Sequence, residues 1–214
     1  MSMMQFITQN YDSLVDSLLR HIMLVAVSVG IGVVVSIPLG IFLTRHKRLA
    51  APVLAFAGTI QTIPGLVMLG FALLLFGIGE LPALVVLSLY AILPILRNTY
   101  TGIIGVEDGY IEAARGIGMT NLQVLFQVEL PLSMPSIVSG IRISAVYIVS
   151  WATLAGLIGA GGLGDLIWTG LSTYNTGYIL AGAIPSAILA FIISGAMGLL
   201  QRAITPRGLK GGHA

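Results

Sequence analysis

Cysteine is absent from this chain of 214 residues, and charged side chains make up only 8% of it. The lack of cysteine excludes a disulfide framework, a thiol nucleophile and a thiolate metal site. The shortage of charge excludes a water-soluble globule, because ordinary soluble domains carry roughly 25% charged residues. Hydrophobic residues account for 57% of the chain, and its mean hydropathy is +1.00. Lipid is therefore the expected solvent for most of the chain.

Basic residues and histidines are too scattered for several common kinds of site. The 10 Lys and Arg residues do not gather into a stripe that would bind nucleic acid. His21, His46 and His213 lie far apart, so we expect no metal cluster. Neither Lys47 nor Lys210 is followed by Ser or Thr, as the lysine of an ATP-binding loop would be. The chain is therefore not expected to hydrolyse ATP or to hold a cofactor itself.

Long apolar runs take the place of the missing charge. A bilayer core of about 30 Å needs roughly 20 helical residues, and five segments fit that length. We expect transmembrane helices at about residues 21–44, 52–78, 81–104, 135–158 and 178–201. The sequence thus predicts an all-α, polytopic membrane protein, with residues 1–214 forming a single transmembrane domain.

The positive charges predict how these helices are oriented. Arg45, Lys47 and Arg48 lie between the first two segments, and basic residues in short connections mark the cytoplasmic side. Alternation from that point places the N-terminus outside the cell. The C-terminus, with Arg207 and Lys210, is then cytoplasmic.

The longest cytoplasmic connection, residues 107–130, is amphipathic rather than apolar. We expect two short helices in it, the first capped by Asp108 and ended near Gly118. Thr120 begins the second with a capping-box pattern, and Pro131 is expected to end that helix. An amphipathic helix across the end of a bundle suits the docking of a soluble partner, and it suits the sealing of the bundle as well.

Four separated motifs resemble those of one family. Glu112-Ala113-Ala114, Gly118 and Leu130-Pro131 resemble the EAA signature of binding-protein-dependent ABC importer permeases. Residues 61–64, 93–102 and 159–165 are similar to the osmoprotectant branch of that family, which imports glycine betaine, carnitine, choline and related quaternary ammonium solutes. One departure is Glu129, where the family often has an aliphatic residue.

The resemblance implies a type I importer permease fold in a bacterial cytoplasmic membrane. It implies partners as well: a dimer of ABC ATPase subunits that carry the ATP and Mg, a second permease chain that is identical or paralogous, and an extracytoplasmic solute-binding protein. In such permeases the EAA helix is a coupling helix seated in a cleft of the ATPase. The residues that the resemblance assigns to ATPase coupling are Glu112, Ala113, Ala114, Arg115 and Gly118.

Polar and aromatic side chains within the predicted spans are candidates for the translocation pathway. A quaternary ammonium ion cannot donate a hydrogen bond, so a passage for it needs aromatic faces and hydroxyl dipoles. The hydroxyl groups can instead bond back to helix carbonyls. The candidate pathway residues are Gln61, Thr62, Pro64, Tyr90, Ser150, Trp151 and Thr153, with Tyr147 as a nearby aromatic.

Other functions stay open at this point. An ABC importer permease for a different small solute, such as an amino acid, fits the same motifs. An ion-coupled carrier fits less well, because no carboxylate falls within a predicted span and such carriers commonly place acids there. A channel is also less favoured, since it does not require a docking segment.

Overall fold

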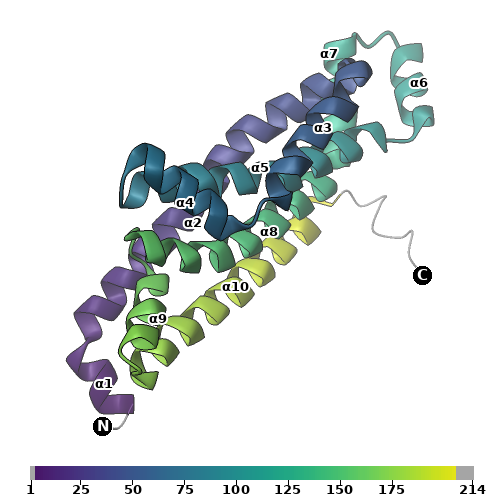
Figure 1. The fold of residues 1–214 in the computed structure, drawn as a ribbon. Helices are drawn as coiled ribbons and strands as arrows, with labels where there is room; N and C mark the ends of the chain where they lie inside the picture. Colours follow the sequence, from purple (N-terminus) through teal and green to yellow (C-terminus); the bar gives the residue numbers. More distant parts are fainter. Residues whose placement is uncertain (1–2, 206–214) are drawn as a thin grey trace.

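The computed structural model describes residues 3–205, and over these residues the chain is a bundle of helices without a strand (Figure 1). The all-α prediction is therefore confirmed. In chain order the helices are α1 (Met3–Gln9), α2 (Tyr11–Arg45), α3 (Lys47–Thr62), α4 (Gly65–Phe76), α5 (Glu80–Ile104), α6 (Asp108–Gly116), α7 (Asn121–Val124), α8 (Leu130–Ala155), α9 (Leu163–Ser172) and α10 (Thr176–Ile204). Arg207 and Lys210 lie outside the described residues.

Within the described part of the chain, 4 helical stretches are long and apolar enough to cross a membrane. They are α2, α5, the stretch Asn121–Ile158 that contains α8, and α10. Helices α3 and α4 pass the same test only together, and they are bent by 92°. The chain therefore has up to 5 spans, the fifth being a broken one.

The second predicted span, residues 52–78, is wrong as a single helix. The chain leaves the helical conformation at Ile63 (φ −72°, ψ 129°) and Pro64 (φ −57°, ψ 132°), between α3 and α4. The physical reason is Pro64, whose ring disfavours the α conformation of the residue before it. Proline also lacks the N–H that would continue the hydrogen-bond ladder.

Pro131 does not end a helix, contrary to the prediction. The chain stays helical from Asn121 through a π-helical turn at Leu125–Glu129 and into α8. Pro131 lies just after the π-helical turn, and a local π-helical adjustment accommodates the missing N–H of a proline within a continuous membrane helix. Asp108 is likewise not the cap of α6, because Glu107 holds the N-cap position and makes no side-chain cap bond.

Close approach of backbones holds α2, α5 and α8 together. A Cβ on Gly32 of α2 would meet Ala91 of α5 at 2.9 Å, and one on Gly140 of α8 would meet the carbonyl of Pro94 at 2.8 Å. Ser144 adds a hydrogen bond of 3.1 Å to the carbonyl of Ala91. Small residues at crossings allow this packing in lipid, where the hydrophobic effect does not drive helices together.

The two ends of the bundle differ (Figure 1). Helices α6 and α7 lie at one end, beside the start of α3, and helices α1 and α9 lie at the other. Helix α10 runs along the outside of the bundle. Only 11% of an 18-residue apolar stretch of this helix is buried. A large face of α10 is thus open for packing against lipid or another protein.

Candidate coupling segment and translocation site

The coupling hairpin, residues 108–129, begins with α6 and turns at Gly118. Gly118 has φ +86°, in the left-handed region that glycine adopts at little cost. Its N–H donates to the carbonyl of Arg115 at 2.9 Å, and the N–H of Met119 donates to that of Ala114 at 3.1 Å. This pair of bonds is a Schellman motif, which satisfies the last carbonyls of a helix. The predicted end of the first helix near Gly118 is therefore found, with a physical requirement for glycine.

The second half of the hairpin begins as the sequence predicts. The hydroxyl of Thr120 accepts from the N–H of Gln123 at 3.4 Å, and the side-chain oxygen of Gln123 accepts from the N–H of Thr120 at 2.8 Å. This reciprocal capping box satisfies two donors that the helix leaves unpaired. It fixes the direction in which α7 leaves the turn.

The predicted coupling residues lie on the surface of the hairpin. Glu112, Ala113, Arg115 and Gly118 are exposed, and only Ala114 is buried. Apolar side chains are exposed beside them: Ile117 is 81% exposed and Leu122 68%. Tyr110 and Phe126 are also exposed. Apolar side chains exposed in this way mark a surface for contact with another protein or with membrane lipid.

An ion pair at the base of the hairpin was not among the predicted site residues. Both guanidinium Nη atoms of Arg45, the last residue of α2, donate to the carboxylate of Glu129, one of them at 3.1 Å. The side chain of Glu129 is 4% exposed and that of Arg45 41%. Glu129 was the signal in the sequence that could have revealed this pair, because the family often has an aliphatic residue at that position. The pair ties the hairpin to the end of α2.

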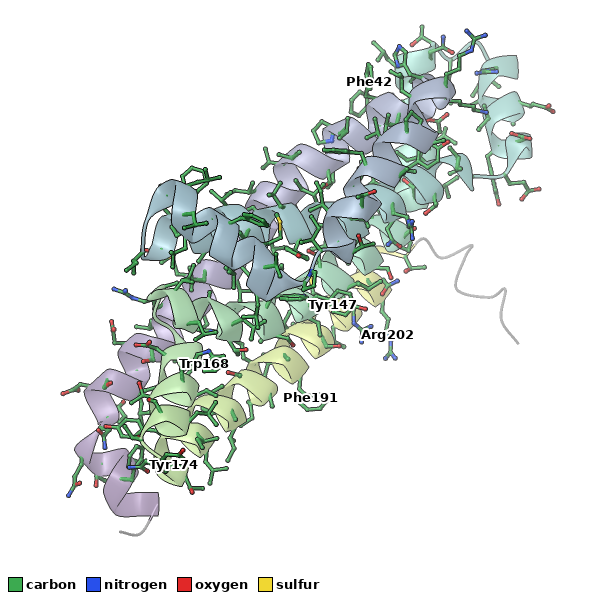
Figure 2. All side chains as sticks on the ribbon, viewed as in Figure 1. Phe42, Tyr147, Trp168, Tyr174, Phe191 and Arg202 are labelled. Atoms are coloured by element: carbon green, nitrogen blue, oxygen red, sulfur yellow. The ribbon has the colours of Figure 1, made fainter. Side chains whose placement is uncertain are left out.

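The break between α3 and α4 borders a cavity of about 270 Å³ lined by Gln61, Tyr90, Tyr147 and Trp151, which we call the break pocket. Three of these four, Gln61, Tyr90 and Trp151, are among the predicted pathway residues. Tyr147 precedes Trp151 by one helical turn, a spacing that places both side chains on one face of α8. In Figure 2, Tyr147 lies beside the bend from α3 into α4.

Side-chain contacts fix the backbone around the break pocket. The hydroxyl of Tyr90 donates to the carbonyl of Ile63, and the amide nitrogen of Gln61 donates to the carbonyl of Tyr90 at 3.0 Å. The rings of Tyr90 and Trp151 stack with centroids 5.0 Å apart. A Cβ on Gly65 would overlap the ring of Trp151. Glycine is therefore required at the first residue of α4. The break between α3 and α4 is stabilised by specific side-chain contacts.

The remaining pathway candidates do not line the break pocket. Thr62 and Thr153 bond back to the carbonyls of Thr59 and Ser150, each at 2.7 Å, as hydroxyl groups in helices often do. Thr153 also receives the indole N–H of Trp168 of α9 on its backbone carbonyl, at 3.1 Å. Ser150 is exposed on α8 and Pro64 lies in the break itself.

Comparison with known proteins gives one consistent result. Residues 36–207 match the family described as "Binding-protein-dependent transport system inner membrane component". The glycine betaine/carnitine/choline transport system permease protein OpuCB of Bacillus subtilis (strain 168) is 46% identical over 209 residues, covering 98% of this chain and 96% of that protein. The osmoprotectant import permease protein OsmW of Salmonella typhimurium is 39% identical over 215 residues, covering 98% of this chain and 100% of that protein. Among solved structures, the MetNI methionine ABC transporter in an inward-facing conformation matches with a TM-score of 0.81 and 27% identity, over 91% of this chain and 97% of that one.

Proposed function

Because the chain belongs to the family of binding-protein-dependent transport system inner membrane components, we propose that it is the permease subunit of an ATP-driven importer for quaternary ammonium solutes. The observation that carries the choice of solute is the identity of 46% to OpuCB over 98% of the chain, since the name of that protein gives glycine betaine, carnitine and choline. The chain forms the membrane pathway, and hydrolysis of ATP belongs to a separate subunit with its own ATP and Mg.

The coupling hairpin is the docking element for the ATPase subunit. Exposed Ile117 and Leu122 supply apolar contact area, and exposed Glu112 supplies a charge for a basic group of the partner. The Schellman turn at Gly118 and the capping box at Thr120 hold the hairpin in one shape. A rigid hairpin tied to α2 through Arg45 passes movement of the ATPase to the bundle more completely than a flexible loop does.

Two permease chains enclose the pathway, and they rest on a dimer of ATPases. The open face of α10 supports this assembly, because a face of that size in a single chain is available to a second permease chain. An extracytoplasmic binding protein delivers the solute at the end that carries α1 and α9. The N-terminus is then outside the bacterial cytoplasmic membrane, and the coupling hairpin is in the cytoplasm.

Uptake by proteoliposomes that contain the complete importer and its loaded binding protein tests the choice of solute. Labelled glycine betaine, carnitine and choline are each offered outside proteoliposomes that contain ATP. Labelled methionine is offered in a parallel experiment. We expect accumulation of at least one quaternary ammonium solute and none of methionine. Accumulation of an amino acid alone would favour the second candidate function, an amino-acid importer, which the likeness to MetNI makes the relevant competitor.

A further inference from the structure

The break pocket contains aromatic rings and an amide but no formally charged side chain. Its lining consists of Gln61, Tyr90, Tyr147 and Trp151. A cation without hydrogen-bond donors is held in such a site by the negative faces of aromatic rings, at centroid distances of up to about 6 Å. A carboxylate or a phosphate would instead need a charged partner, which this lining lacks. The lining thus selects a chemical class of ligand.

We propose that the break pocket is a binding station for the trimethylammonium group of the solute within the permease itself. The proposal rests on the proposed function for the identity of the solute, but the site is argued from its own geometry. Discontinuous membrane helices bring backbone dipoles and side chains to a substrate in many transporters. Here the discontinuity is next to the pocket. Gln61 lies in the last turn of α3, and the hydroxyl of Tyr90 donates to the carbonyl of Ile63 in the break.

The pocket is formed before any solute arrives. Tyr90 is held by its bond to Ile63 and by the bond from Gln61 to its own carbonyl. Trp151 stacks on the ring of Tyr90, and edge atoms of its six-membered ring lie against Gly65. Sites whose side chains are fixed by neighbouring contacts lose less entropy when the ligand binds. The two inner rings therefore form a rigid wall.

Tyr147 forms the outer side of the pocket. Tyr147 is 56% exposed, in contrast to Tyr90, which is 5% exposed. A ring on the open side can cover a bound cation and withdraw again by a change of rotamer, a movement that costs little at an exposed position. The station therefore has a fixed wall and one movable ring, which suits transient binding during passage.

The test is equilibrium binding of labelled choline to the complete permease and ATPase assembly in lipid nanodiscs, with the binding protein left out. The competitor is the uncharged isostere of choline, in which a carbon replaces the quaternary nitrogen. We expect saturable choline binding that the isostere does not displace. The substitution Tyr147→Leu removes one ring and is expected to weaken binding by about fivefold or more, whereas Tyr147→Phe keeps the ring and most of the affinity. Phe56→Leu alters an exposed ring of α3 that does not line the pocket and serves as the control.

Several outcomes would overturn the station. Absence of saturable binding, in an assembly that still imports solute with its binding protein, would refute the station and leave the proposed function standing. Equal displacement by the uncharged isostere would show an apolar cavity without cation recognition. Loss of affinity in Phe56→Leu equal to that in Tyr147→Leu would place the binding elsewhere. Failure of both binding and import would refute the proposed function as well.

Discussion

The guanidinium of Arg45 and the carboxylate of Glu129 join the last residue of α2 to the π-helical turn at the base of the coupling hairpin. The two residues are 84 positions apart in the sequence. Glu129 is buried, and a buried carboxylate is costly unless it is paired. The pair is the single salt bridge among residues 3–205, and in the proposed function it lies where movement of the ATPase enters the bundle.

Removal of Arg45 as the partner of Glu129 is the first prediction. Arg45→Gln should lower the stability of the purified assembly by about 1–3 kcal/mol, because it leaves a buried carboxylate without its charged donor. It should also lower the amount of solute imported per ATP hydrolysed. The exchanged pair, Arg45→Glu with Glu129→Arg, should regain part of both. A normal import ratio in Arg45→Gln, together with an unchanged melting temperature, would show that the pair has no positioning role.

Gly118 provides the second prediction. Gly118→Ala forces a side chain into a backbone with φ +86°, at a cost of about 1–2 kcal/mol. The hairpin should change direction, and less ATPase should co-purify with the permease. Gly116→Ala is the matched control, because Gly116 has helical backbone and nothing lies within 4 Å of its Cβ position. Equal co-purification by the two variants would contradict the docking role of the hairpin.

The third prediction concerns Gly65 and the ring of Trp151. Gly65→Ala places a methyl group where Trp151 now lies, so the ring must leave its stack with Tyr90. Import should fall by about tenfold, which corresponds to a loss of about 1.4 kcal/mol in the free energy of solute binding. Insertion and assembly should continue. Gly70→Ala in the same helix is the control, because no atom lies within 4 Å of that Cβ position. Comparable import rates for the two variants would show that the break pocket does not matter for transport.

Topology is the fourth prediction. Reporter domains inserted at His46 and in the turn of the coupling hairpin should report the cytoplasm, and one inserted at Asp165 should report the outside. The reason is the position of Arg45, Lys47 and Arg48 at the end of the bundle that carries α6 and α7. A cytoplasmic readout at Asp165 would contradict a membrane path in which α3 and α4 together make one crossing.

Local chemistry made parts of the molecule predictable from sequence. The capping box at Thr120 and the turn at Gly118 depend on neighbouring residues, so the sequence sufficed for both. The full extent of the helices did not follow, because apolar length marks the lipid-facing part of a helix and not its polar ends. Helix α2 accordingly begins at Tyr11, ten residues before the predicted start at 21.

Contacts between distant segments account for the features that the sequence did not reveal. The pairing of Arg45 with Glu129 and the fit of Trp151 onto Gly65 depend on how α2, α4 and α8 cross. Pro131 was misjudged because a proline ends a helix only where its missing N–H is not accommodated, and the π-helical turn before α8 accommodates it. At Pro64, by contrast, the chain does leave the helical conformation, and α3 and α4 are bent by 92°.

The most direct measurement of the central claim is ATP hydrolysis and solute import by the complete importer in proteoliposomes, with and without loaded binding protein. We expect the loaded binding protein to stimulate both rates together. Glu112→Lys, which reverses an exposed charge of the coupling hairpin, should remove the stimulation, and Glu80→Lys, with the same change of net charge in the first turn of α5, should not. Import that proceeds without ATP and follows an ion gradient would contradict the account, and so would a full response in the Glu112→Lys variant.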